Sequence, residues 1–329
     1  MTPKKNAQAT SSGDVSLIRK MFSAQEFSIF LALLLIAAFI TAVAPSFMST
    51  RNLFLVSRQV SFLAIIAISE LFVILTAGID LSVGSVVGLS GVTTGIALAA
   101  GIHPVLAVLI GLATGAVTGV INGVLIAYVG VTPFIVTLGM LSMARGMVWI
   151  LTKGWPITEI PPGFMVLGQG RVLGLPLPLL ILAVVAVLAY IVLKYLPFGR
   201  RVYAIGGNER ATELSGINVR RIKLMVYALS NILASITGII LVARFSSAQA
   251  SVGETWELDA IAAAVIGGTS LAGGKGSVLG ALIGAAIMGV IRNGLVLMKV
   301  SVYWQQFIIG MVIVLAAIID ILRNRRGRS

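Results

Sequence analysis

The sequence contains no cysteine and a single histidine, His103, and only 11% of its 329 residues are charged. Without cysteine the chain forms no disulfide and offers no thiolate to a metal or a substrate. One histidine cannot supply the imidazole cluster of a typical metal centre, so we expect no metal bound by this chain. No serine stands beside a base, and no carboxylates are spaced for acid–base work. The pattern therefore indicates no catalytic residue and no enzyme.

Apolar residues, in contrast, are abundant. They make up 58% of the chain, and the mean hydropathy is +1.05. Such a composition is typical of an integral membrane protein. The chain also has 36 glycines, and small residues let transmembrane helices approach closely. A formal net charge of +13 could suggest nucleic acid as a partner, but the basic residues fall mostly in loops and tails. They are better explained by orientation in a bilayer.

The apolar runs predict an all-α, polytopic transmembrane helix bundle with about ten spans. A spanning helix needs about 20 mostly apolar residues. An N-terminal tail with room for an interfacial helix (1–26) precedes the transmembrane domain (27–322), and a basic tail (323–329) follows it. A short eighth run could be re-entrant, which leaves eight to ten spans. The runs are 27–44, 59–78, 81–101, 104–129, 133–151, 176–195, 224–243, 259–273, 277–298 and 303–322.

Most lysines and arginines fall on one side if both termini are cytoplasmic, as the positive-inside rule requires. This assignment predicts a multi-pass protein of the cell's inner membrane, with a cytoplasmic loop at 196–223 and an external loop at 152–175. Arg145 and Arg292 lie within apolar runs, and we expect both to snorkel toward an interface.

The stretch GGTSLAGGKGS (267–277) is close to a phosphate-binding loop but does not match one. A P-loop has glycine six residues before its lysine and serine or threonine directly after it. Here Thr269 stands six residues before Lys275, and Gly276 follows the lysine. The flanking segments are apolar, so we interpret the stretch as a tight cytoplasmic turn. No nucleotide or other cofactor is expected on this chain.

A second stretch resembles this turn. GIDLSVGSVVG (78–88) and GTSLAGGKGSVLG (268–280) both begin with Gly-x-x-Leu and end with Gly-Ser-Val-x-Gly. Both turns fall on the cytoplasmic side and follow a run in the same direction. The similarity predicts a parallel internal repeat, with chance likeness between glycine-rich turns as the alternative.

Polar residues inside the apolar runs are candidates for a transport path, because an ionisable group in a membrane is costly. Glu70, Asn122 and Asn293 are these candidates. The alternative for Glu70 is a packing carboxyl, and for the two asparagines interhelical hydrogen bonding. Asp80 follows the segment TAGI and begins a run, where its carboxylate would cap free N–H groups.

The cytoplasmic loop contains GGNERATELSG (206–216). This pattern predicts a short helix with Asn208 as its N-cap and an end at Gly216. A short helix on the cytoplasmic face could serve a partner protein, or it could be an ordinary connector whose charges fix topology.

Three motifs carry a resemblance to a known family: TAGIDLSVGS (76–85), YAIGGNERATELSGINV (203–219) and ELDAIAAAVIGGTSLAGGKGS (257–277). In this order they resemble the permease subunits of ribose-type ATP-binding cassette (ABC) sugar importers. The resemblance implies a homodimeric permease that carries a monosaccharide such as ribose. It also implies two kinds of partner, a cytoplasmic ATPase that uses ATP and Mg and an extracytoplasmic sugar-binding protein.

In such importers a cytoplasmic coupling helix of the permease contacts the ATPase. That role would fall to Gly207, Asn208, Glu209, Ala211, Leu214, Ser215, Gly216 and Ile217. The wider importer pattern is Glu-Ala-Ala followed by Gly, and Arg210 and Thr212 depart from it.

The external polar residues are candidates for contact with the binding protein. These are Glu159, Glu254, Trp256 and Glu257. The residues by themselves, without the resemblance, leave two other classes open. One is an ion-coupled secondary transporter of small polar solutes, for which Glu70 would suit, and the other is a channel or scaffold without energy coupling.

Overall fold

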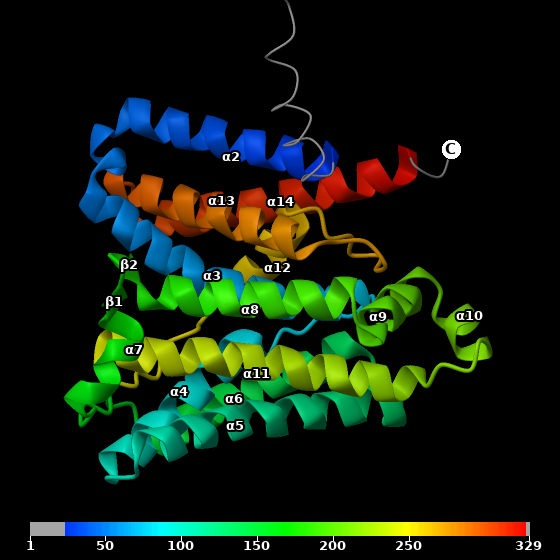
Figure 1. The fold of residues 1–329 in the computed structure, drawn as a ribbon, viewed down its shortest axis with the longest axis horizontal. Helices are drawn as coiled ribbons and strands as arrows, with labels where there is room; N and C mark the ends of the chain where they lie inside the picture. Colours follow the sequence, from blue (N-terminus) through cyan, green and yellow to red (C-terminus); the bar gives the residue numbers. More distant parts are fainter. Residues whose placement is uncertain (1–23, 327–329) are drawn as a thin grey trace, which may run out of the picture.

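The computed structural model describes residues 24–326, and these form a bundle of helices (Figure 1). The predicted interfacial helix in residues 1–26 lies outside the described residues except for 24–26, with which α2 begins. Residues 327–329 of the basic tail also lie outside them. The long helices are α2 (Ala24–Val43), α3 (Thr50–Leu75), α4 (Val83–Ala99), α5 (Pro104–Val124), α6 (Pro133–Thr152), α8 (Leu177–Lys194), α11 (Val219–Phe245), α12 (Trp256–Ile266), α13 (Val278–Leu297) and α14 (Val302–Arg326).

Short elements connect these helices. The bundle is extended by the single turns η1 (Pro45–Met48), η2 (Leu125–Val129, π-helical) and η3 (Pro162–Met165), and by α7 (Val166–Gln169), α9 (Pro197–Gly207) and α10 (Glu209–Leu214). A two-residue hairpin, β1 (Arg171–Val172) and β2 (Leu175–Pro176), is the sheet of the described chain. The predicted external loop 152–175 therefore contains η3, α7, strand β1 and the first residue of β2.

Each predicted apolar run contains one helix, which confirms a polytopic helical membrane protein. Seven of the described helices are long and apolar enough to cross a bilayer. The others are shorter: α4 has 17 residues, α12 has 11, and the apolar part of α14 covers Val302–Leu315. The eighth run is predicted to extend over 259–273, but its helix, α12, ends at Ile266 because the glycine-rich turn 267–277 follows.

Helices α3 and α11 form the centre of the bundle and run in opposite directions (Figure 1). Helix α11 packs on α4 and α5, whereas α3 packs on α12 and α13. Glycines make the close contact between α5 and α11 feasible, since Cβ atoms added at Gly115 and Gly119 would lie closer than 3.0 Å to the backbone of α11. Helix α3 thus packs on the helices that follow α11 in the sequence, and α11 packs on those that follow α3. The parallel repeat stays a prediction.

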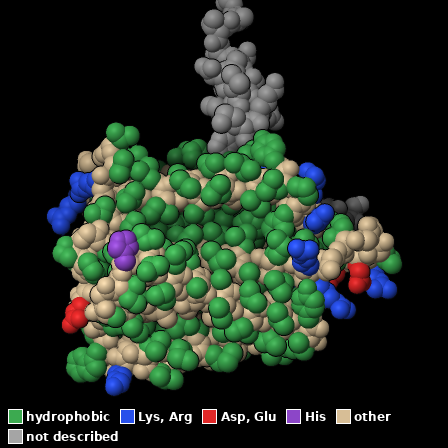
Figure 2. All heavy atoms as spheres, turned by 60° about the horizontal axis from the view of Figure 1, so that its bottom comes forward, with side chains coloured by type: hydrophobic (Ala, Val, Ile, Leu, Met, Phe, Trp, Pro, Cys, Tyr) green, Lys and Arg blue, Asp and Glu red, His purple; other side chains and the backbone are tan. Residues whose placement is uncertain are grey.

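The outer face of α5 and α6 is apolar. Exposed side chains there include Leu109, Val117, Phe134 and Ile150. Figure 2 shows hydrophobic side chains over the middle of this face, with lysines, arginines and acidic residues gathered toward its two ends. Apolar atoms facing lipid across the middle and charges at both ends are what a membrane-spanning bundle requires.

The two ends of the bundle differ in what they carry (Figure 1). One end, here called the α10 end, carries α9, α10, the turn 267–277 and both ends of the described chain. The other, here called the hairpin end, carries α7, β1 and β2. The turn 267–277 contacts the end of α3 at the α10 end, where the backbone N–H of Gly274 donates to the carbonyl of Leu75 at 3.0 Å.

Candidate functional site

Helix α10 has the limits that the sequence predicts. The side chain of Asn208 accepts a hydrogen bond from the Ala211 backbone N–H at 2.9 Å, which makes Asn208 the N-cap. Gly216 has φ of +81°, the left-handed conformation that glycine adopts at a helix C-terminus. Its N–H donates to the Glu213 carbonyl at 2.9 Å. The predicted short helix and its cap are confirmed.

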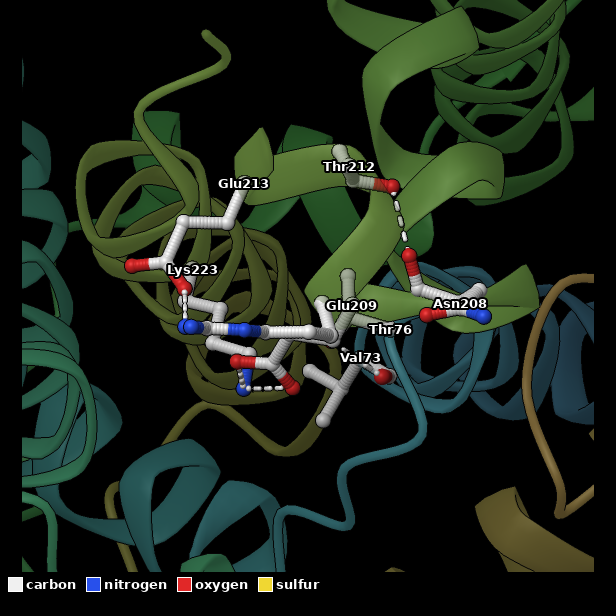
Figure 3. Close-up of polar contacts among 8 residues, drawn as sticks. Val73, Thr76, Asn208, Glu209, Thr212, Glu213 and Lys223 are labelled. Atoms are coloured by element: carbon white, nitrogen blue, oxygen red, sulfur yellow. Dashed lines mark hydrogen bonds and ion pairs between the residues drawn. The ribbon is translucent and has the colours of Figure 1, made fainter. Parts of the chain in front are cut away.

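One ion pair joins α10 to α11, and a second lies within α10 (Figure 3). Lys223 of α11 contacts both carboxylate oxygens of Glu209, at 2.7 and 2.8 Å. Arg210 contacts Glu213 at 2.9 Å within α10 itself. The buried Thr212 turns toward the bundle, and its hydroxyl donates to the Asn208 carbonyl at 2.8 Å. One face of α10 is thus fixed to α11 while the other is free.

The residues mapped to the coupling role are mostly exposed, and Glu209 among them is the one that binds Lys223. Ile217 is half-buried and the remainder are exposed, namely Gly207, Asn208, Glu209, Ala211, Leu214, Ser215 and Gly216. Leu214 is 75% exposed. The Leu214 side chain is therefore accessible from outside the bundle.

Helix α9 connects α10 to the centre of the bundle. A Cβ added at Gly206 would overlap the Leu75 carbonyl oxygen at the end of α3 and the backbone N of Gly274. The Tyr203 hydroxyl donates to the Gly276 carbonyl at 2.8 Å. Burial, and secondarily the Glu26 carboxylate, raise the pKa of Tyr203, so the phenol stays protonated and able to donate. Helix α9 therefore packs against the turn 267–277.

A polar network lies in the interior behind this end. Oδ1 of Asp80 accepts hydrogen bonds from the backbone N–H of Ser82 at 2.9 Å and from its hydroxyl at 2.5 Å. Oδ2 accepts from Nδ2 of Asn231 at 2.7 Å, and Asn122 donates to the Ser82 hydroxyl at 3.0 Å. Asp80 satisfies a backbone donor at the start of α4, as expected. It also connects that turn to α11, which the sequence did not predict.

Glu70 lies in the middle of α3 and is fully buried. Within residues 24–326 neither of its carboxylate oxygens has a hydrogen-bond partner, and the Tyr227 hydroxyl of α11 likewise has none. Asn293 forms a reciprocal amide pair with Asn52, each Nδ2 donating to the other Oδ1 at 2.9 Å. The alternative of interhelical hydrogen bonding is therefore confirmed for Asn122 and Asn293.

At the hairpin end, Glu159 and Glu254 are exposed and Trp256 is half-buried. The prediction that Glu257 is an external contact for the binding protein is wrong. Glu257 is only 9% exposed, and its Oε2 lies against Gly84 of α4. It occupies the first turn of α12, which points into the bundle.

The expected snorkelling of the two intramembrane arginines is wrong. Arg145 donates to the carbonyls of Ala250 and Val252 at 2.8 and 3.0 Å, and so holds the segment before α12. Arg292 of α13 forms a salt bridge with Asp259 of α12 at 2.5 Å. Sequence reasoning missed Asp259, although an acidic residue inside an apolar run was a signal for it.

Fold and site together define a multi-pass membrane protein with an exposed short helix at one end. Residues 52–317 match the family described as "branched-chain amino acid transport system / permease component", and the chain belongs to this permease family. It is therefore a protein of the inner membrane.

Among its relatives, the ribose import permease protein RbsC of Escherichia coli (strain K12) is 46% identical, over 88% of this chain and 92% of the relative. RbsC of Bacillus subtilis (strain 168) is 44% identical, over 90% and 92%. The D-allose transport system permease protein AlsC of Escherichia coli (strain K12) is 36% identical, over 91% and 93%. No solved structure matches.

Proposed function

We propose that this chain is the membrane-spanning subunit of an ABC importer and provides the path for a monosaccharide, ribose or a related sugar. The observation that carries the proposal is the exposed α10, capped by Asn208 and held to the spans by Lys223. The relatives named above, ribose import and D-allose transport permeases, support the same class of substrate.

The proposed partners follow from this role. A cytoplasmic ATPase binds ATP and Mg and contacts α10, so this chain is a transport subunit with no ATPase site of its own. An extracytoplasmic sugar-binding protein delivers the sugar, with Glu159 and Glu254 as candidate contacts. Two copies of the permease form a homodimer in the bilayer, and both termini are cytoplasmic, on the side of α10.

The contacts of α9 and α10 suggest how a movement of the ATPase would reach the spans. A displacement of α10 acts on α11 through Glu209 and Lys223. Through α9 it acts on the end of α3 and on the turn before α13, because Gly206 and Tyr203 contact both. Since α3 and α11 pack on different halves of the bundle, one input moves both halves.

The experiment is uptake of labelled D-ribose into liposomes that contain the permease, with and without its ATPase and binding protein. We expect uptake only with all three components and ATP. Leu214→Asp should reduce it about tenfold or more, since a charge in an apolar protein contact costs more than about 1.4 kcal/mol.

Leu173→Asp is the matched control. Leu173 is 96% exposed but lies in the hairpin at the opposite end, so its substitution should leave ATP-driven uptake unchanged. Uptake by the permease alone down a proton or sodium gradient would instead support the ion-coupled alternative and direct attention to Glu70.

A further inference from the structure

A cleft opens between α12, α13 and α14 toward the hairpin end. Its volume is about 540 Å³, within the usual range of small-molecule pockets of roughly 300–1,000 Å³. Glu254 and Thr255, just before α12, line it, as do Ile309 and Ile313 of α14, and the Asp259–Arg292 pair forms part of its wall.

The ion pair makes this cleft unlike a gap between apolar helices. The Asp259 side chain is 5% exposed and that of Arg292 is 35% exposed, so the guanidinium faces the cleft while the carboxylate holds it. A smaller cavity of about 90 Å³ also contacts the pair, and Trp256 and Phe62 line it. Charged groups in contact with acyl chains are costly, so this surface fits a water-filled path better than lipid.

The wall offers both donors and acceptors, and Glu254 is its acidic group outside the ion pair. Gln305 uses its amide N–H on the Val300 carbonyl at 2.8 Å, which leaves its oxygen for a ligand. Gln306 lines the cleft with a second amide, and the positive charge of Arg292 is balanced by Asp259. Leu258 and Ile309 supply apolar surface between these groups.

We propose that this cleft binds a neutral polyhydroxylated molecule, a single sugar, on its way through the permease. Sugar hydroxyls both donate and accept hydrogen bonds and its C–H faces pack on apolar side chains, which matches the wall. The neutralised ion pair and the Glu254 carboxylate leave no free cationic group in the described wall for an anionic ligand. This inference rests on the proposed function and assigns a sugar-binding step to this chain itself.

The absence of native cysteine allows a direct test. Leu258→Cys places one thiol in the cleft and removes none of its polar groups. In the full chain, reconstituted in lipid nanodiscs, a small water-soluble methanethiosulfonate reagent should modify this thiol. D-ribose should slow the modification about threefold at twice its Kd, as simple occupancy requires. Ribose 5-phosphate should not slow it.

Three controls fix the interpretation. Leu173→Cys, in the hairpin outside the cleft, should react at a rate that ribose does not change. Adding Gln305→Leu to Leu258→Cys should abolish the protection. Adding Gln249→Leu to Leu258→Cys instead, in the loop before α12, should preserve the protection by ribose.

Two results would overturn the proposal. An unreactive thiol at 258 would mean that another surface, such as the second permease copy, covers the cleft. A thiol equally reactive with and without ribose would mean that no sugar binds. Uptake by the complex with Leu258→Cys separates the two proposals, because ATP-driven transport without protection leaves the proposed function standing and removes only the cleft.

Discussion

The turn around Asp80 and the middle of α3 around Glu70 both bury a carboxyl group completely, yet the two regions treat it in opposite ways. Asp80 receives three hydrogen bonds, from the backbone and hydroxyl of Ser82 and from Asn231. Glu70 has none within residues 24–326. The difference arises because a turn leaves backbone N–H groups free, whereas those in the middle of a helix are already bonded.

This comparison separates structural from functional candidates. A buried carboxyl with satisfied hydrogen bonds stabilises the fold, and Asp80 joins α4 to α11 in this way. A buried carboxyl without partners costs free energy, so stability does not explain its presence. An unpaired ionisable group in a membrane span is a candidate for function, which keeps Glu70 as the strongest of the predicted path residues.

Asp80→Ala should have the largest effect on stability. It removes the acceptor of three hydrogen bonds and leaves the Ser82 N–H and the Asn231 amide buried without it. We expect the free energy of unfolding to fall by about 3 kcal/mol, given about 1–3 kcal/mol for each unsatisfied buried donor. Thermal unfolding of the purified chain in detergent measures this. An unchanged midpoint would contradict the structural role and make Asp80 comparable to Glu70.

Asn293 and Asn52 provide an intermediate case, since they are paired but uncharged. Asn293→Leu should lower the free energy of unfolding by about 1 kcal/mol, because interhelical hydrogen bonds in membrane proteins contribute about 0.6 and up to about 1.7 kcal/mol. The double variant with Asn52→Leu should recover part of the loss, since no amide is then left unpaired. If the two losses simply add, the amides do not act as a pair.

The sequence alone predicted those features of the fold that depend on a local pattern of residues. Long apolar runs located the long helices, seven of which among the described residues could cross a bilayer. Asn208 and Gly216 determined the limits of α10, because capping depends on residues a few positions apart. The sequence alone did not predict contacts between residues that only the packing of separate helices brings together. Asp259 and Arg292 are 33 residues apart on separate helices. Glu257 follows a polar loop, and only the approach of α4 at Gly84 buries it.

Glu70→Gln should have the smallest effect on stability and so provides the sharpest test of the comparison. An amide of the same shape loses no hydrogen bond here, and we expect the free energy of unfolding to change by less than about 0.5 kcal/mol. In the reconstituted complex the same variant should reduce ATP-driven sugar uptake if Glu70 lies on the transport path. Arg51→Gln, on the exposed surface, is the control and should alter neither quantity. A loss of stability as large as that of Asp80→Ala would show that Glu70 is a structural carboxyl as well, and the distinction between the two regions would then disappear.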